Sequence, residues 1–275
     1  MTKKGSAGGI IVFLLLIILA ATTLLPIAYM IMVTFLNKNE YLQNIFAFPS
    51  SFDFTNYRIV LESFDFLRMT LNSLFISVTT VFFSLLFNSL CAYSLVKLQW
   101  NGKGLIRMLI IVGMFMPGQV LILPVYQILI KLNLVNNMFG LIIFYVATSV
   151  PFTVMMIMSN LRGISNEIIE SAMIDGAGSF TVYSKIILPL LKSTLATATI
   201  LNLISNWNEL FYSLILLQDE KIRTVTVSVV SLTNKFASNP PLLYAGLLLS
   251  ALPVILVYLI AQKHIIKGVS SGSVK

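Results

Sequence analysis

Long apolar runs are the feature that most constrains what this chain can fold into. A helix needs about 20 mostly apolar residues to cross the hydrocarbon core of a bilayer. Only 10% of the 275 residues are charged, against roughly 25% in soluble domains. The connections between the runs are mostly short, so we predict an all-α, polytopic membrane protein that forms a single domain (1–275) with six transmembrane helices. The six runs lie at about 10–36, 71–96, 105–130, 138–159, 194–217 and 242–261.

The first run follows Lys3 and Lys4, as the apolar core of a secretory signal would. It is longer than the 7 to 15 apolar residues of a typical signal core, and no convincing cleavage site follows it. We therefore expect a retained membrane anchor.

The distribution of basic residues predicts the orientation. With both termini in the cytoplasm, eleven of the 18 lysines and arginines lie inside and seven outside. This excess fits the positive-inside rule and explains the net charge of +8 without a nucleic-acid partner.

Few residues are suited to catalysis or metal binding. A single cysteine, Cys91, excludes an internal disulfide or a cysteine metal cluster. The single histidine, His264, is expected to belong to a basic cluster with Lys263 and Lys267. No phosphate-binding loop is present, because Lys103 precedes Gly104 and upstream glycines are missing before Lys192. We expect no catalytic residue, metal site or cofactor in this chain.

Small and polar residues follow one face of the second run and predict close packing against another helix. They are Ser77, Ser84, Asn88, Ser89 and Ala92.

The polar segment 160–192 interrupts the apolar pattern between the fourth and fifth runs. Ser165 is a candidate N-cap for a short helix, and Gly176 and Gly178 favour a sharp turn after it. A second helix is expected from about Ser179 to Leu188, ended by Pro189. The first helix carries an apolar stripe at helical spacing: Ile168, Ile169, Ala172 and Met173. We predict a helix lying on the cytoplasmic surface, which could serve only to anchor two spans.

The spacing within this segment resembles the signature loop of ABC importer permeases. Glu170, Ser171 and Ala172 are followed after three residues by Gly176, and after nine more by Ile186, with Leu188 and Pro189 closing the pattern. Ser171 replaces the family's alanine. Further similarities point to the carbohydrate branch, and most of all to the smaller permease subunit of maltose-type and oligosaccharide-type importers: 72–73, 117–118, 124, 205–209, 217–219, 223–226 and 268–275.

The resemblance implies a permease subunit that forms half of the pathway of an ATP-driven sugar importer in a bacterial cell membrane. Its surface helix would dock into a cytoplasmic ATPase, with Asp175 and Ser179 beside the turn. The implied partners are a second permease subunit, two ATPase subunits that bind ATP and Mg, and an extracytoplasmic sugar-binding protein that contacts loop 218–241.

Polar residues inside the runs are candidates for a substrate pathway. Glu209 is ionisable and lies within the fifth run, where a charge is costly. In the third run Gln119 and Tyr126 are seven residues apart, as are two prolines that can kink a helix. On one continuous helix, four residues of the fifth run would form a single polar stripe: Asn202, Asn206, Glu209 and Ser213. Packing of this stripe against a partner subunit is the alternative, and in the resembled family the main sugar site lies largely on the larger permease.

Three other functions stay open: an ABC permease for a different solute, a secondary transporter independent of ATP, and an integral membrane enzyme. The enzyme is disfavoured because Cys91 and His264 lie far apart in the sequence with no paired carboxylates beside them.

Overall fold

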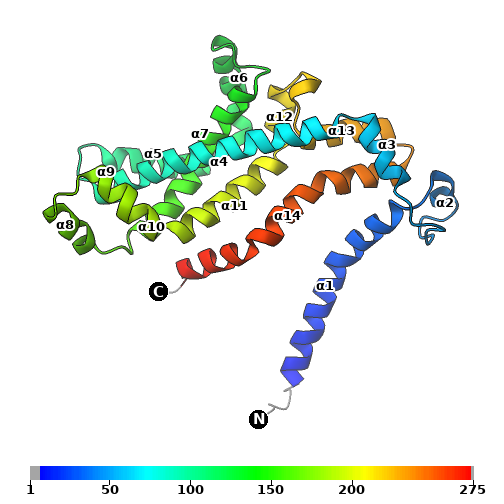
Figure 1. The fold of residues 1–275 in the computed structure, drawn as a ribbon, viewed down its shortest axis with the longest axis horizontal. Coiled ribbons are helices and arrows are strands. Elements are labelled where there is room, and N and C mark those ends of the chain that lie inside the picture. Colours follow the sequence, from blue (N-terminus) through cyan, green and yellow to red (C-terminus); the bar gives the residue numbers. More distant parts are fainter. Residues whose placement is uncertain (1–6, 274–275) are drawn as a thin grey trace. The chain divides into compact units, whose positions relative to one another are not determined.

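In the computed structural model the backbone of residues 7–273 and the side chains of residues 8–259 are described. Within these limits every element is a helix, so the predicted all-α class is confirmed (Figure 1). The longer helices are α1 (Ala7–Val33), α4 (Phe66–Lys97), α5 (Lys103–Phe115), α7 (Met138–Leu161), α11 (Lys192–Asn208), α13 (Val225–Phe236) and α14 (Pro240–Ser273). The shorter ones are α2 (Lys38–Gln43), α3 (Thr55–Ser63), η1 (Gly118–Leu121), α6 (Ile122–Lys131), α8 (Asn166–Ile174), α9 (Ser179–Val182), the π-helical turn η2 (Tyr183–Ile187), α10 (Leu188–Leu190), α12 (Phe211–Leu216) and η3 (Glu220–Ile222). The predictions for Lys3, Lys4, His264 and the segment 268–275 concern side chains outside the described part.

Several helices are long and apolar enough to cross a membrane, as expected for a polytopic membrane protein. In the described part of the chain, four helices are long and apolar enough to cross a bilayer: α1, α4, α7 and α14 up to Leu259. The number rises to six if each of two bent pairs is one span. One pair joins Lys103–Phe115 to Gly118–Lys131 at 104°, and the other joins Ser179–Leu190 to Lys192–Asn208 at 76°.

Pro117 explains the first bend. Met116, which precedes it, is extended with φ −82° and ψ 117°, because a proline ring disfavours helical geometry in the residue before it. The prolines of the third run were expected only to kink a helix, whereas Pro117 ends one.

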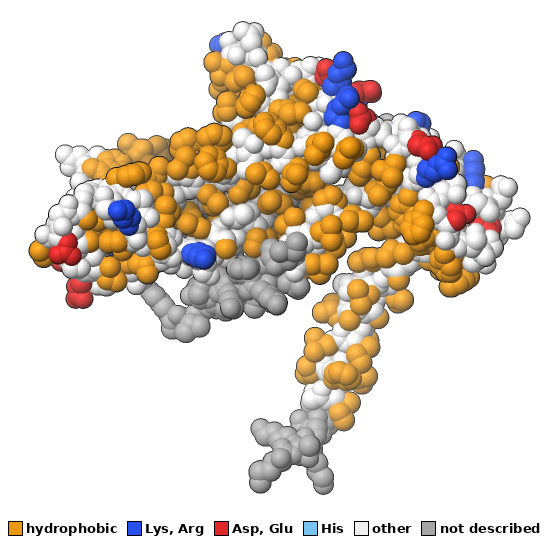
Figure 2. All heavy atoms as spheres, in the orientation of Figure 1, with side chains coloured by type: hydrophobic (Ala, Val, Ile, Leu, Met, Phe, Trp, Pro, Cys, Tyr) orange, Lys and Arg blue, Asp and Glu red, His pale blue; other side chains and the backbone are white. Residues whose placement is uncertain are grey.

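Apolar side chains cover much of the visible surface, and charged ones gather at a few places (Figure 2). On α1 alone, side chains from Ile10 to Leu19 are exposed throughout. Such a surface would be unstable in water but is matched to lipid chains.

Contacts divide the chain into two compact units. Unit 1 comprises 7–67 and 229–252. In it, α3, the later part of α13 and the start of α14 meet around Val60, Leu232 and Ala245. The Asn56 side-chain amide donates to the carbonyls of Thr34 and Leu36, at 2.7 and 2.8 Å, and so ties α3 to the chain that follows α1.

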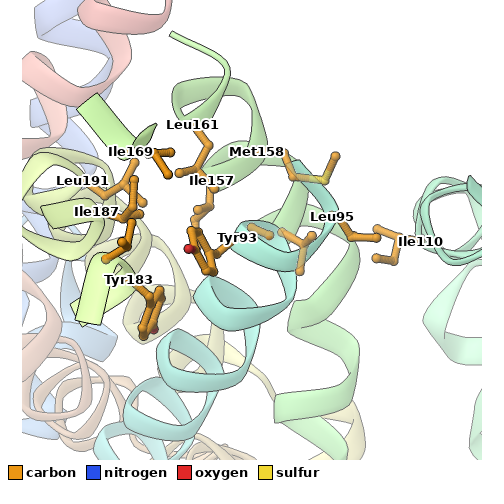
Figure 3. Close-up of a cluster of buried hydrophobic side chains, with 13 residues drawn as sticks. Tyr93, Leu95, Ile110, Ile157, Met158, Leu161, Ile169, Tyr183, Ile187 and Leu191 are labelled. Atoms are coloured by element: carbon orange, nitrogen blue, oxygen red, sulfur yellow. The ribbon is translucent and has the colours of Figure 1, made fainter. Parts of the chain in front are cut away.

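Unit 2 comprises 68–228 and 253–273 and holds two apolar clusters. The first, which we call the α8 cluster, packs α4, α5 and α7 against the segment from α8 to Leu191 (Figure 3). Its members labelled in that figure are Tyr93, Leu95, Ile110, Ile157, Met158, Leu161, Ile169, Tyr183, Ile187 and Leu191. The second lies among α4, α6, α7 and α12, around Leu141, Phe144 and Tyr145.

The predicted packing face of α4 is confirmed, because Ser77, Ser84, Asn88, Ser89 and Ala92 are all buried. The hydroxyls of Ser84 and Ser149 are 2.8 Å apart, and the Asn88 amide donates to Ser149 Oγ at 3.0 Å. These contacts join α4 to α7.

Candidate functional site

The first candidate site is the segment that begins at α8. Ser165 is the predicted N-cap, and its Oγ accepts the Glu167 amide at 3.2 Å. The Lys97 ammonium, at the end of α4, donates to the Ile164 carbonyl at 2.6 Å and to Asn166 Oδ1 at 2.8 Å. The start of α8 is therefore capped locally and held by the end of a membrane helix.

The other end of α8 is closed by a Schellman motif around Gly176. Gly176 has φ +84°, and its amide donates to the Met173 carbonyl at 3.0 Å. The next amide, of Ala177, reaches back to the Ala172 carbonyl at 2.9 Å. Glycine is favoured here because a Cβ is strained at positive φ. The predicted sharp turn is confirmed, and its geometry accounts for the glycine of the signature pattern.

The apolar stripe of α8 divides between the core and the surface. Ile169 is buried in the α8 cluster, and Ala172 packs against it. Ile168 and Met173 are exposed, and the neighbouring Ile174 is 86% exposed. The polar members of the signature, Glu170, Ser171 and Asp175, are also exposed. One edge of α8 thus fixes it to the protein while apolar and acidic side chains stay accessible.

The return from α8 differs from the expected helix ended by Pro189. Helical structure continues through Pro189 to Leu190, and it includes the π-helical turn η2. Proline has no N–H and crowds the carbonyl four residues earlier. The wider π turn before it bonds the Leu188 amide to the Tyr183 carbonyl, one residue further back than in an α-helix, and makes room for the ring.

Several contacts hold this return in place. The Tyr93 hydroxyl donates to the Ser179 carbonyl at 3.2 Å, and the Tyr183 and Ser89 hydroxyls are 2.7 Å apart. Of the remaining signature residues, Leu188 packs against the α8 cluster, Ile186 is half-buried and Pro189 is exposed.

The second candidate site is a cavity of about 650 Å³ in unit 2, among α5, η1, α6, α7, α11 and α12. We call it the Glu209 cavity. Its walls are mostly apolar, with a few polar groups. The lining residues are Gly113, Met114, Met116, Gly118, Leu121, Val125, Phe144, Tyr145, Ala147, Thr148, Pro151, Phe152, Ser205, Asn206, Glu209 and Tyr212.

Glu209 lies at a break in the expected fifth helix. Helix α11 ends at Asn208, and Glu209 has extended geometry, φ −73° and ψ 120°. Its carboxylate folds over the start of α12. Oε2 accepts the Tyr145 hydroxyl at 2.6 Å and the Ser213 amide at 3.1 Å, while Oε1 accepts the Tyr212 amide at 2.9 Å. Donors from two helices therefore hold this carboxylate in one orientation.

The predicted pathway residues do not form one stripe. Asn206 and Glu209 both line the cavity. Asn202 is buried instead and bonds Thr153 Oγ1 at 3.1 Å, and Ser213 is buried with its hydroxyl 2.8 Å from that of Tyr145. The stripe required a continuous helix, and the break at Glu209 separates its members.

The candidates of the third run are not among the residues that line the cavity. Gln119 is exposed on η1, and Tyr126 packs on the cluster around Leu141. Tyr145, Phe144 and Gly118 also line the cavity and were not predicted as pathway residues. A tyrosine within an apolar run is the one available signal, because a buried hydroxyl needs a partner.

Among the described side chains, no group of three or more His, Cys, Asp and Glu residues is arranged to hold a metal ion.

Comparison with known proteins agrees with this architecture. Residues 84–271 match the family described as "Binding-protein-dependent transport system inner membrane component". "Probable ABC transporter permease protein YurM" of Bacillus subtilis (strain 168) is 32% identical, with 91% of this chain and 83% of that protein covered. "Melibiose/raffinose/stachyose import permease protein MelC" of the same organism is 30% identical over 90% of each.

A solved structure is also similar. One chain of a bacterial ABC transporter involved in the import of the acidic polysaccharide alginate aligns with a TM-score of 0.84 and 28% identity, covering 95% of this chain and 99% of that one. With a family match over most of its length, helices that can span a membrane, and relatives that align with it over most of both chains, this chain belongs to the binding-protein-dependent inner-membrane transport components, the permeases of ABC importers.

Proposed function

We propose that this chain is the permease subunit of an ATP-driven sugar importer and forms half of its translocation pathway. Relatives named for sugar uptake support the cargo class. They include MelC and "Multiple sugar-binding transport system permease protein MsmG" of Streptococcus mutans, which is 31% identical over 92% of each chain. A second permease subunit, two cytoplasmic ATPase subunits that bind ATP and Mg, and an extracytoplasmic sugar-binding protein complete the complex. Both termini lie in the cytoplasm.

The observation that carries the coupling role is the attachment of α8. Ser165 caps its start, Gly176 forms the turn at its end, and Ile169 is buried in the α8 cluster. In contrast, the side chains of Ile174 and Phe180 are 86% and 73% exposed. Exposed apolar side chains beside acidic ones suit a protein partner with an apolar cleft and a basic rim. In this proposal α8 docks into the ATPase, and the signature residues form the docking helix, its turn and its return: Glu170, Ser171, Ala172, Asp175, Gly176, Ser179, Ile186, Leu188 and Pro189.

A docked α8 has a direct mechanical route into the membrane. Ile169 packs in one cluster with Ile157 and Leu161 of α7 and with Tyr93 of α4 (Figure 3). Because close-packed interiors deform little, a push on α8 moves these helices together. ATPase closure would then open the pathway outward, and hydrolysis would return it inward.

Gly176→Ala tests the docking role, and Gly178→Ala is its matched control. Gly176 has φ +84°, whereas a Cβ on Gly178 meets nothing within 4 Å and its φ is −74°. A Cβ in the left-handed region costs about 1–2 kcal/mol, so we expect Gly176→Ala to lower ATPase retention on the purified permease pair about fivefold or more. Gly178→Ala should retain it as the wild type does. Equal retention by both variants contradicts the docking role.

Uptake of radiolabelled solutes by the complete complex in liposomes tests the cargo. Transport of an oligosaccharide that needs both ATP and the binding protein is expected. Uptake confined to a non-sugar solute would move the chain to another branch of the ABC permeases. Uptake without ATPase subunits would instead indicate a secondary transporter.

A further inference from the structure

We infer that the Glu209 cavity binds one sugar ring of the cargo and selects against rings that carry a carboxylate. This inference rests on the proposed sugar import and adds the charge class of the sugar. The cavity volume of about 650 Å³ lies within the range of roughly 300–1,000 Å³ that is usual for small-molecule sites.

The charge of the cavity favours a ring without a carboxylate. Among the described residues that line the cavity, Glu209 is the one acid, and none of them is a lysine, arginine or histidine. Tyr145 and the amides of Tyr212 and Ser213 hold the carboxylate by hydrogen bonds, but none of these groups carries a positive charge. A second carboxylate in this space would meet a like charge between apolar walls, where repulsion is stronger than in water. An uncharged ring, or one with an amino group, avoids that cost.

Two polar groups of the cavity can each form a further hydrogen bond with a ligand. Glu209 Oε2 accepts hydrogen bonds from the hydroxyls of Tyr145 and Ser213 and from the amides of Ser213 and Tyr212. Among the described residues, Oε1 accepts a hydrogen bond from the Tyr212 amide alone, at 2.9 Å. A carboxylate oxygen can accept two hydrogen bonds, so Oε1 has room for a donor from a ligand. The amide nitrogen of Asn206, another lining residue, is buried without a partner in the described part of the chain. A ring hydroxyl, which both donates and accepts, can satisfy either group.

The apolar wall of the cavity suits the C–H face of a sugar ring. Phe144, Phe152 and Tyr212 line the cavity together with Met114 and Met116. The rings of Phe144 and Tyr212 have centroids 4.4 Å apart and planes tilted by 54°, so they are in contact and make an angled aromatic surface. The C–H face of a sugar packs on such a surface while its hydroxyl edge meets Glu209 and Asn206.

The experiment is direct binding to the full complex in nanodiscs, without the binding protein, so that delivery does not select the ligand. The probes are a radiolabelled neutral trisaccharide that the complex imports and the same trisaccharide with one ring oxidised to a uronic acid. In the wild type the neutral probe should bind at least about tenfold more tightly. Glu209→Gln keeps the shape of the side chain and removes its charge, and it should bring the two affinities to within about threefold.

Glu209→Gln can also disturb the start of α12, because the carboxylate accepts hydrogen bonds from its first amides. A second variant therefore leaves Glu209 unchanged. Thr148→Lys leaves Glu209 in place and adds an ammonium to the lining, and it should raise affinity for the uronate probe about tenfold. Glu62→Gln is the control, since the Glu62 side chain is exposed on α3 and this variant should keep the wild-type ratio. The inference is overturned if the wild type binds both probes equally, or if neither cavity variant changes their ratio. A complex that binds and imports no sugar overturns the proposed function as well.

Discussion

The hydroxyl of Tyr212 occupies the space that a side chain on Gly118 would need. Gly118 begins η1, directly after Pro117 ends the helical geometry of α5, and Tyr212 follows the break at Glu209. The interruptions of the third and fifth apolar runs therefore touch each other. Glycine permits this approach because it has no Cβ.

Gly118→Ala should displace Tyr212. The added methyl overlaps the tyrosine hydroxyl, and overpacking of this kind costs typically about 1–3 kcal/mol. Because the Tyr212 amide also holds Glu209, the cavity should change shape. We expect a lower unfolding temperature of the permease pair and about tenfold slower sugar uptake in liposomes.

Gly104→Ala is the matched control. A Cβ on Gly104 meets nothing within 4 Å, and the residue lies in the first turn of α5. Alanine is favoured over glycine in helices by up to about 1 kcal/mol, so this variant should be as stable as the wild type or slightly more so. Wild-type behaviour of both variants would refute the contact between the two breaks.

Tyr145→Phe should weaken the hold on Glu209. The Tyr145 hydroxyl lies 2.6 Å from Glu209 Oε2 and 2.8 Å from Ser213 Oγ. Removing it leaves a carboxylate short of a donor, at a cost of about 1–3 kcal/mol. Chemical denaturation of the permease pair measures this loss. The exposed Tyr258 supplies the control Tyr258→Phe, which should change nothing; equal stability of the two variants would contradict the role given to Tyr145.

The sequence predicts much of this fold because lipid imposes strong patterns. The length of the apolar runs predicts the helices α1, α4, α7 and α14. Local chemistry also predicts both ends of α8, since an N-cap serine and a glycine at positive φ depend mainly on neighbouring backbone.

The cavity could not be predicted in the same way. The spacing of Asn202, Asn206 and Ser213 fits one helix, but Glu209 ends that helix and caps the next one. Nothing local shows that Tyr145, 64 residues earlier, donates to the same carboxylate. Pro189 fails as a helix end for a related reason, since the π turn that accommodates it depends on the packing of Tyr183 and Ile187.

Asn72→Ala should loosen the loop before α13. The Asn72 amide donates to the carbonyls of Lys221 and Arg223, at 2.9 and 3.0 Å. Its loss leaves two carbonyls without this partner, at about 1 kcal/mol each. Hydrogen exchange of residues 218–225 should therefore speed up about tenfold or more, with little change in α7.

Asn101→Ala is the control for this change, since Asn101 lies on an exposed turn. The control should exchange as the wild type does. Unchanged exchange of residues 218–225 in Asn72→Ala would show that other contacts hold the loop.

Helix α2 should become less stable in acid, because protonation of Glu40 weakens the hydrogen bonds that its carboxylate accepts. In the folded chain, hydrogen bonds from the Ser50 hydroxyl and then from the Asn37 amide lower the pKa of Glu40 below its ordinary value of 4.5. A carboxyl whose pKa falls on folding stabilises the fold at pH above the unfolded value, and this contribution is lost as the pH drops through the folded value. Exchange of residues 38–44, corrected for the intrinsic rate, should thus lose protection below about pH 4.5. Glu40→Gln should remove this dependence by lowering protection at neutral pH, whereas Glu62→Gln should preserve it. A Glu40→Gln profile that still falls with acid would assign the effect to another group.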